Sequence, residues 1–220
     1  MKLFTGPLSM FGAKAQIAAL EKGIAIEAVM VPFDKDDNYL PKHPEVLRIN
    51  PKRQVPVLID GEVELFDSTQ IFEYLEDAAP EPPLWPREVA SRARARQLEH
   101  LSDEVFFPHV IRLMGLQHDM QSEAAVTACA ACARFYEQME ERLAHAEYLA
   151  GPYSFADIAF YMAQLFGARM GAPMTDATPF LLRWRERMSE RPAVRQVVRP
   201  MAAYLVSQGR TLPDFVAAIA

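Results

Sequence analysis

Two short segments of the chain bring together the backbone donors, the carboxylate and the hydroxyl that a small peptide ligand would need. The first is Gln54-Val55-Pro56-Val57-Leu58, and the second is Phe66-Asp67-Ser68. A proline at the entry of a strand removes one backbone donor, and a cis bond before Pro56 would turn the main chain of Val55 outward to pair with the ligand. The second segment opens a predicted helix, whose N-terminus favours anions. This pattern predicts a site for a zwitterionic peptide, while an ordinary hairpin before an N-capped helix stays as the alternative.

Charged side chains flank these segments where a zwitterionic peptide carries its own charges. The free carboxylate of the ligand would meet Lys42 or His43, and its ammonium group would need Asp67. Ser68 and the first backbone amides of the following helix would hold an α-carboxylate. A peptide such as glutathione has its charges in this arrangement.

Ser9 lies between a predicted strand and a predicted helix, where the partial positive charge of a helix N-terminus gathers. Its hydroxyl could there donate a hydrogen bond to a bound thiolate. A free thiol has a pKa near about 8.5, and a helix N-terminus together with such donors lowers that value. Serine is also a favoured N-cap, so a purely capping role for Ser9 is the alternative.

Other reactive side chains fit structural roles better than chemical ones. The CxxC spacing of Cys129-Ala130-Ala131-Cys132 occurs within an Ala-rich predicted helix, which favours buried structural cysteines. A metal site would need two further ligands at suitable spacing, and none lies nearby, so no metal is expected. Ser154-Phe155-Ala156-Asp157 fits a capping box and is a folding signal. The histidines of the predicted helical part are scattered and have no evident catalytic or metal-binding partners; they are His100, His109, His118 and His145.

The composition is that of a globular protein, with 50% hydrophobic and 24% charged residues in a chain of 220. A net charge of −6 argues against a nucleic-acid groove, which needs clustered lysine and arginine. Two cysteines give no disulfide framework and favour a reducing compartment. Because the sequence shows neither a signal peptide nor the roughly 20 apolar residues of a membrane helix, we expect a cytoplasmic protein without membrane contact.

The first part of the chain, residues 1–79, predicts a small α/β domain. Alternating or continuous apolar runs predict strands over Lys2–Thr5, Ile26–Val31, Val55–Ile59 and Val63–Phe66. Helical spacing predicts helices over Phe11–Glu21, near Glu45–Ile49, and from Asp67 to about Asp77. Asp60-Gly61 is a hairpin signal, Gly23 fits the position just past a helix end, and the polar segment Asp34–Pro44 predicts an irregular connection. These elements would give a parallel strand pair with an added antiparallel hairpin.

Residues 80–87 contain four prolines and predict an extended linker, whose Leu84 and Trp85 would pack on a domain. Residues 88–220 predict an all-helical domain. Its expected helices are Glu88–Leu116 with a kink at Pro108, Ser122–Leu149, a fully buried Ser154–Met170, Phe180–Ser189 capped by Thr178-Pro179, and a last helix after Pro192 that is broken or bent at Pro200. The tail from Arg210 to Ala220 is expected to fold back onto this bundle.

Four motifs together resemble the cytosolic-type glutathione transferases, with a bacterial, serine-type-like character. Ser9 to Ile24 is similar to the first βα unit of the family, Asn50 to Leu58 to its cis-proline segment, Phe66 to Leu75 to its γ-glutamyl site, and Tyr148 to Asp157 to the capping box of its helical domain. The resemblance implies a thioredoxin-like N-terminal domain, an all-α C-terminal domain and a homodimer. It also implies conjugation of glutathione, as co-substrate, to small hydrophobic electrophiles in detoxification.

The resemblance assigns a role to each matched position. Ser9 matches the catalytic serine of serine-type members. Glutathione would be bound by Lys42, Gln54, Val55, Pro56, Asp67 and Ser68, with Val55 on its cysteinyl backbone. An electrophile pocket would include Phe11, Phe106, Val110 and Met114, although these apolar residues serve equally well as bundle core.

Three departures from the family pattern limit the assignment. Met10 stands where many serine-type members have proline, and Asp67 replaces the more usual glutamate. No cysteine lies near residues 9–12, which argues against disulfide exchange, and the missing serine-serine-cysteine run argues against maleylacetoacetate isomerase. The alternatives are another glutathione-dependent enzyme, namely a peroxidase, isomerase or dehalogenase, or a non-catalytic binding or regulatory protein on the same fold.

Overall fold

The computed structural model describes residues 1–33, 39–40 and 42–219, which form two compact units. Residues 1–83 and 192–209 make the first unit, and residues 84–191 and 210–219 make the second. The helix after Pro192 is therefore grouped with the first unit by its packing, although the sequence pattern counts it with the helical domain. The predicted division into residues 1–79, a linker of residues 80–87 and residues 88–220 remains a prediction. Part of the expected irregular connection, residues 34–38 and 41, lies outside the described residues.

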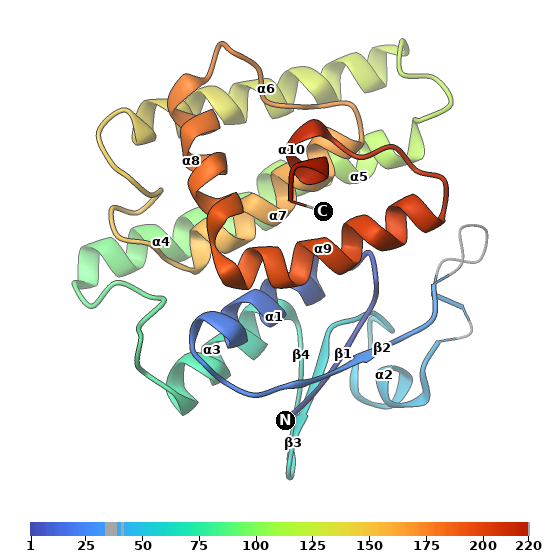
Figure 1. Cartoon of the computed structure of the whole chain (residues 1–220), viewed down its shortest axis with the longest axis vertical. Coiled ribbons are helices and arrows are strands. Elements are labelled where there is room, and N and C mark those ends of the chain that lie inside the picture. The colour runs from blue at the N-terminus through green and yellow to red at the C-terminus, as the bar shows by residue number, and fades with distance from the viewer. Residues whose placement is uncertain (34–38, 41, 220) are drawn as a thin grey trace. The chain divides into compact units, whose positions relative to one another are not determined.

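The first unit is built on a four-stranded sheet with the order β2-β1-β3-β4 (Figure 1). Its strands are β1 (Lys2–Thr5), β2 (Glu27–Met30), β3 (Val57–Asp60) and β4 (Val63–Phe66). β1 pairs with β2 in parallel and with β3 antiparallel, and β3 and β4 form the hairpin predicted at Asp60-Gly61. Gly61 turns that hairpin with a φ of 60°, which glycine adopts without steric cost.

The period-two alternation of β1 and β3 divides their side chains between two small cores. Leu3 and Leu58 lie on one face with residues of α1 (Met10–Glu21) and α3 (Ser68–Ala78). Phe4 and Val57 lie on the other face with Val46 of α2 (Pro44–Ile49). Because successive strand residues point to opposite faces, one short sheet holds helices on both sides.

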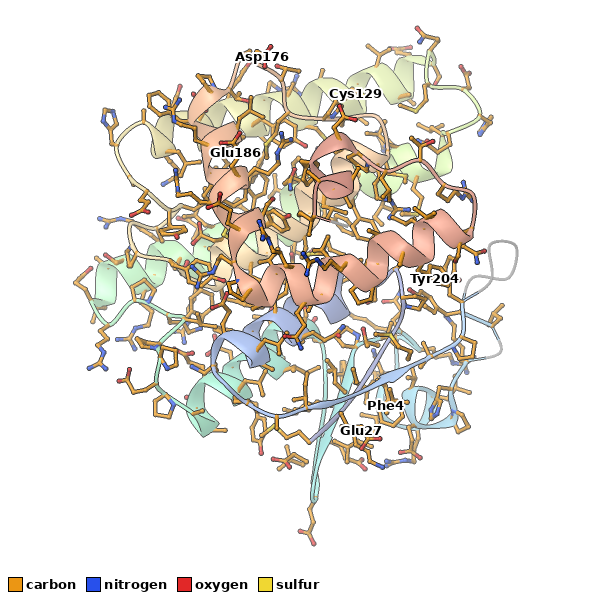
Figure 2. All side chains as sticks on the ribbon, viewed as in Figure 1. Phe4, Glu27, Cys129, Asp176, Glu186 and Tyr204 are labelled. Carbon is orange, nitrogen blue, oxygen red and sulfur yellow. The ribbon has the colours of Figure 1, made fainter. Side chains whose placement is uncertain are left out.

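Helix α9 (Pro192–Ser207) completes the first unit. The hydroxyl of Tyr204 on α9 donates a hydrogen bond to the backbone oxygen of Phe33 over 2.9 Å, and Figure 2 marks this tyrosine. Of the break or bend expected at Pro200, the break is wrong, since α9 runs through the proline without interruption. Apolar residues on both sides of Pro200, including Val197 and Met201, are buried, and this packing offsets the hydrogen bond that the proline cannot make.

The second unit is all-helical. Its elements are α4 (Val89–Leu101), a π-helical turn η1 (Ser102–Phe106), α5 (Phe107–Gly115), α6 (Glu123–Leu143), α7 (Phe155–Arg169), α8 (Pro179–Glu190) and α10 (Asp214–Ala217). Every residue of α7 from Phe155 to Gly167 is buried, so α7 is the central helix of this unit, as predicted. The tail folds back through α10, where Val216 and Ile219 are buried. Leu84 and Trp85 of the linker are also buried, and the Trp85 ring meets Phe155 edge to face.

Two helix boundaries differ from the sequence prediction, and one predicted N-cap residue makes no capping hydrogen bond. The kink expected at Pro108 takes the form of the π-helical turn just before it, because a proline lacks the N–H that the preceding helical turn would use. α6 ends at Leu143, well before Leu149, and a bridge between Tyr148 and Gly151 follows. Thr178 is the N-cap residue of α8 without accepting a capping bond.

The cap of α8 comes from another helix. The carboxylate of Glu140 on α6 accepts hydrogen bonds from the backbone N–H groups of Phe180 and Leu181 over 3.0 and 2.7 Å. A carboxylate at a helix N-terminus satisfies free backbone donors and matches the helix dipole.

Among the residues that the structure describes, no helix has both the length and the apolar character needed to cross a membrane.

Candidate functional site

Ser9 is the N-cap of α1, and its hydroxyl oxygen accepts a hydrogen bond from the backbone N–H of Gly12 over 3.0 Å. The side chain is nearly buried, with a relative exposure of 8%. The structure thus gives Ser9 the capping role that the sequence left as an alternative. A hydroxyl has one donor and two acceptor lone pairs, so a cap that uses one lone pair is compatible with donation to a ligand.

The first turn of α1 is pressed against the end of β1 at Gly12. A Cβ atom at this position would lie 1.9 Å from Oγ1 of Thr5 and 3.1 Å from the hydroxyl oxygen of Ser9. No larger residue fits there without moving the helix. Thr5 is fully buried and accepts a hydrogen bond from Gln16 at 3.5 Å. Close packing at Gly12 therefore fixes where the Ser9 hydroxyl lies relative to the sheet.

The loop before β3 carries the cis bond between Val55 and Pro56 that the sequence predicts. The paired part of β3 begins at Val57, so Val55 lies outside the ladder. Its side chain is half-buried against the core that contains Phe4. The main chain at Val55 is thus placed at the end of a strand and outside its pairing, as a site for an added peptide strand requires.

Asn50 organises this loop, and the sequence analysis gave it no role. Its side-chain amide donates to the backbone oxygen of Gln54 over 2.6 Å, and its Oδ1 accepts from the backbone N–H of Lys52 over 2.9 Å. Its own backbone oxygen accepts from Arg53, which has a φ of 55°. Asn50 is buried and ends α2, so it connects that helix directly to Gln54. A polar residue between an apolar helical turn and a proline was the available sequence signal.

Asp67 combines a helix cap with an unusual backbone. Its φ is 74° and its ψ is 130°, and its Oδ1 accepts from the backbone N–H groups of Thr69 and Gln70 over 3.0 and 3.4 Å. A non-glycine residue held at positive φ costs of order 1–3 kcal/mol, and such residues cluster at functional sites. Ser68, the first residue of α3, is buried. The N-terminus of α3 and the Asp67 carboxylate are thus held in one place.

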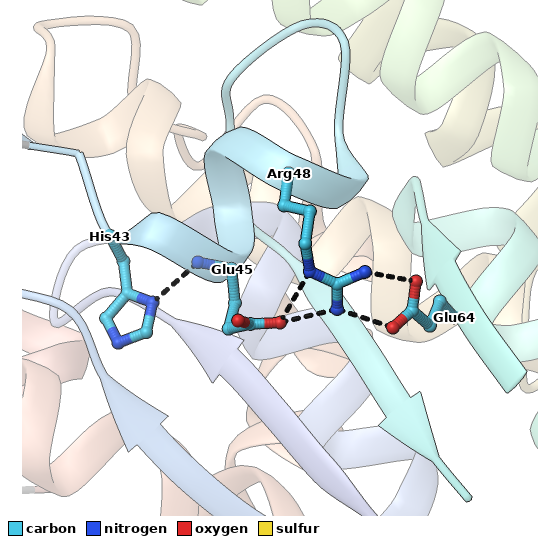
Figure 3. A network of polar contacts seen from close by, with 4 residues as sticks. All are labelled: His43, Glu45, Arg48 and Glu64. Atoms are coloured by element: carbon cyan, nitrogen blue, oxygen red, sulfur yellow. Dashed lines mark hydrogen bonds and ion pairs between the residues drawn. The ribbon is translucent and has the colours of Figure 1, made fainter. Parts of the chain in front are cut away.

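Lys42 and His43 precede α2. His43 is the N-cap of α2, where its Nδ1 accepts from the backbone N–H of Glu45 over 3.2 Å (Figure 3). Its ring packs on Phe4 with centroids 4.7 Å apart. The Nζ of Lys42 lies 5.9 Å from the centroid of the Tyr39 ring. The ring of His43 therefore caps α2, and the recorded contact of Lys42 is with the Tyr39 ring.

Comparison with known proteins agrees with this geometry. Residues 3–83 match the family described as glutathione S-transferase, N-terminal domain, and residues 102–192 match glutathione S-transferase, C-terminal domain. Glutathione S-transferase Z2 of Arabidopsis thaliana is 30% identical over 209 residues, which cover 90% of each chain. The chain belongs to the glutathione S-transferase family. This membership confirms the predicted thioredoxin-like domain followed by an all-helical domain.

Two further relatives bear on what this glutathione S-transferase fold does. The solved structure of a sphingomonad glutathione S-transferase complexed with glutathione is 25% identical, has a TM-score of 0.75, and is matched over 92% of this chain and 99% of that one. A stringent starvation protein A homologue from Coxiella burnetii is 33% identical over 109 residues. That match spans 49% of this chain and about half, 48%, of the relative. The family membership supports glutathione-dependent activity, and the relatives also include stringent starvation protein A homologues.

Of the four residues expected at an electrophile pocket, two are buried in the helical core and two are at least partly exposed. Phe106 and Val110 are fully buried, and the Phe106 ring lies among the rings of Phe135, Tyr136 and Phe160 at 5.2 to 5.4 Å. Phe106 and Val110 thus take the core role that the sequence left open. Met114 is 44% exposed, and Phe11 is half-buried with the Nζ of Lys14 5.5 Å from its ring centroid.

The cysteines of this family member take no part in the candidate site. Cys132 is buried in α6, and burial raises the pKa of its thiol to about 12. Cys129 donates a weak hydrogen bond to the backbone oxygen of Gly171 over 3.8 Å. The burial predicted for the pair is therefore confirmed for Cys132, whereas Cys129 is only partly buried. Within the described residues, no three His, Cys, Asp or Glu side chains are grouped so as to hold a metal ion.

Proposed function

We propose that this chain is a glutathione transferase that joins the thiolate of glutathione to small hydrophobic electrophiles. The observation that carries the proposal is the placement, within one unit, of the helix-capping Ser9, the Val55–Pro56 loop outside the strand ladder, and the strained cap Asp67. These are the three elements that a thiol-bearing, zwitterionic tripeptide requires.

Glutathione binding follows from the polar groups at these elements. The main chain of Val55 pairs with the cysteinyl backbone of the tripeptide in the manner of an added strand. The N-terminus of α3 and the buried Ser68 hold the γ-glutamyl carboxylate, because the positive end of the helix dipole favours an anion there. The carboxylate of Asp67 receives the ammonium group. Lys42 and Gln54 take the glycyl end.

The chemistry takes place at the N-terminus of α1. The Ser9 hydroxyl donates a hydrogen bond to the sulfur of glutathione, and the first turn of α1 adds its partial positive charge. Both effects favour the thiolate, which is the nucleophile, over the thiol. The thiolate attacks the electrophilic carbon, a carbon–sulfur bond forms, and the leaving group departs with its electron pair.

We further propose that the protein acts as a homodimer, is cytoplasmic, and works in detoxification. The dimer and the role in detoxification are proposed from the family. The cytoplasmic location is proposed from the lack of a disulfide framework in the sequence. Sedimentation of the full chain tests the dimer directly. A monomer that retains full activity would remove the dimer from the account.

A regulatory role is the second candidate. The observation that favours it is the likeness to stringent starvation protein A homologues, one of which is 33% identical over 109 residues. Met10, which stands where many serine-type members have proline, is consistent with altered chemistry at Ser9. A regulatory protein on this fold would keep the fold and lose turnover.

Two measurements on the full chain separate the candidates. Calorimetric titration with glutathione tests binding, and turnover with glutathione and chlorodinitrobenzene tests conjugation. A transferase gives both saturable binding and turnover. Binding without turnover on a panel of electrophiles and peroxides favours the regulatory role, and the absence of binding contradicts both the site and the proposed activity.

A further inference from the structure

An ion-pair network on the surface of the first unit joins α2 to β4. The guanidinium of Arg48 on α2 donates to both carboxylate oxygens of Glu64 on β4, with Nη1 2.7 Å from Oε2 (Figure 3). The same guanidinium donates through Nε, at 3.1 Å, and through Nη2 to one oxygen of Glu45, three residues earlier on α2. Arg48 therefore bonds to Glu45 on its own helix and makes a bidentate ion pair with Glu64 on β4.

Helix α2 depends on such side-chain contacts for its position. It has six residues, of which Val46 is the buried one. A helix this short is not stable by itself in water, because nucleation costs more than a few hydrogen bonds return. Its attachments within the described residues include Val46 and the partly buried Ile49 at the core, the His43 cap on Phe4, and Arg48 on the side of β4.

The two elements that Arg48 connects lead to opposite halves of the candidate glutathione site. α2 ends at Asn50, whose side chain holds the backbone oxygen of Gln54 next to Val55. β4 carries Glu64 three residues before Asp67, the cap of α3. A shift of α2 relative to β4 would thus move the cysteinyl–glycyl half of the site relative to the γ-glutamyl half.

We propose that Arg48 is a positioning residue that sets the spacing between the two halves of the glutathione site through its fork onto Glu64. The inference rests on the proposed function, since it assigns a part in glutathione binding. Arg48 touches no ligand in this account; it acts on binding through α2 and β4.

The chemistry of the ion-pair network suits a positioning role for Arg48. A planar guanidinium meets a carboxylate with two parallel hydrogen bonds, which fixes orientation as well as distance, and a lysine cannot reproduce this. The hydrogen bonds from Arg48 hold the pKa of the Glu64 carboxyl below its ordinary value, so the pair stays ionised at neutral pH. Single exposed ion pairs add little to stability, whereas a shared network with bidentate geometry can hold two elements in register.

The test is a double-mutant cycle on glutathione binding by the full-length protein. Arg48→Met should raise the dissociation constant of glutathione about fivefold, the upper range for an exposed pair, and leave kcat at saturating glutathione within about twofold. Asp67→Asn removes the charged contact of one half of the site. If Arg48 acts by aligning the two halves, Arg48→Met should have less than about a twofold effect in the Asp67→Asn background.

The matched control is Lys2→Met, which breaks another exposed ion pair of the same unit, Lys2 to Glu27 at 4.0 Å between β1 and β2. Glu27 is marked in Figure 2 on the outer strand β2. We expect this variant to bind glutathione as the wild type does. The exchanged pair Arg48→Glu with Glu64→Arg should recover part of the lost affinity, because the fork is rebuilt in the opposite sense.

The outcomes separate this inference from the proposed function. Wild-type protein that binds no glutathione overturns both. Wild-type binding together with unchanged binding by Arg48→Met overturns the positioning role alone. Equal losses from Arg48→Met in the wild-type and Asp67→Asn backgrounds also overturn it, because independent effects add. A loss confined to the wild-type background, with Lys2→Met unchanged, supports it.

Discussion

The hydroxyl oxygen of Ser9 accepts a hydrogen bond from the backbone N–H of Gly12 across 3.0 Å. The same oxygen atom thus caps the N-terminus of α1 and is the proposed donor to the sulfur of glutathione. A substitution of Ser9 consequently changes both helix stability and chemistry, and an informative experiment has to separate the two.

Ser9→Ala should lower the free energy of unfolding by about 0.5–2 kcal/mol through loss of the cap, and should lower kcat with chlorodinitrobenzene by about tenfold or more through loss of the donor. Ser9→Gly should lower kcat equally while costing only a few tenths of a kcal/mol, because glycine is tolerated as an N-cap. Urea denaturation and steady-state kinetics measure the two effects. Full turnover by Ser9→Gly would remove the hydroxyl from the mechanism.

Asp67→Asn should weaken glutathione binding about tenfold or more, since a charged partner for the ammonium group is lost. The stability of the variant should stay near that of the wild type, because asparagine caps helices and tolerates positive φ. Asp67→Ala should lose both binding and stability. Calorimetry with glutathione gives the dissociation constants, and an unchanged value for Asp67→Asn would contradict the γ-glutamyl assignment.

Asp157 predicts a pH dependence of stability in the helical unit. Burial raises the pKa of this carboxyl from 3.8 to about 6, although its oxygens accept bonds from Leu149, Ser154 and Trp184. A carboxyl whose folded pKa is raised stabilises the fold below its unfolded pKa, and this contribution is lost as pH rises from about 4 to about 6. A shift of about two pKa units corresponds to roughly 3 kcal/mol.

The measurement for Asp157 is urea denaturation of the wild type and of Asp157→Asn, which does not titrate. The free energy of unfolding of the wild type minus that of the variant should fall between pH 4 and pH 6, by up to about 3 kcal/mol. A difference that rises over this interval would show that the hydrogen bonds outweigh burial and that the carboxyl titrates below its ordinary pKa.

Glu140→Ala should lower the free energy of unfolding by about 0.5–2 kcal/mol, because two backbone donors at the start of α8 lose their acceptor. Glu141→Ala, at the exposed neighbouring position, is the control and should change stability by less than about 0.5 kcal/mol. Glutathione binding should be the same in both variants. Equal stability of the two variants would mean that water replaces the cap without cost.

Local signals predicted the first unit well. The apolar run Lys2–Thr5, the Asp60-Gly61 turn and the helix stop at Gly23 each depend on residues close in sequence, and the structure contains all three features. The capping box at Ser154 and Asp157 is likewise present. Such features are set by backbone preference and by period-two or helical spacing, which a single sequence displays.

What the sequence did not display depends on partners far along the chain. Glu140 accepts a hydrogen bond from the backbone N–H of Phe180, 40 residues later, and no local pattern marks it. Apolar spacing cannot separate a core residue such as Phe106 from an exposed apolar residue such as Met114, because both fit the same helical pattern. The sequence does not mark Asn50 or Arg48 either. The side chain of Asn50 bonds to the loop at Gln54 and that of Arg48 to Glu64 on β4, and these contacts are visible only in the fold.

The most direct test of the account is a pH titration of the thiolate absorbance of glutathione bound to the full-length protein, compared with Ser9→Gly. The account predicts that wild-type protein lowers the thiol pKa by at least about one unit from its free value near 8.5, and that the variant loses most of this shift. Glutathione that binds with the pKa of the free thiol, or a shift equal in both proteins, would contradict the claim that Ser9 and the N-terminus of α1 prepare the nucleophile.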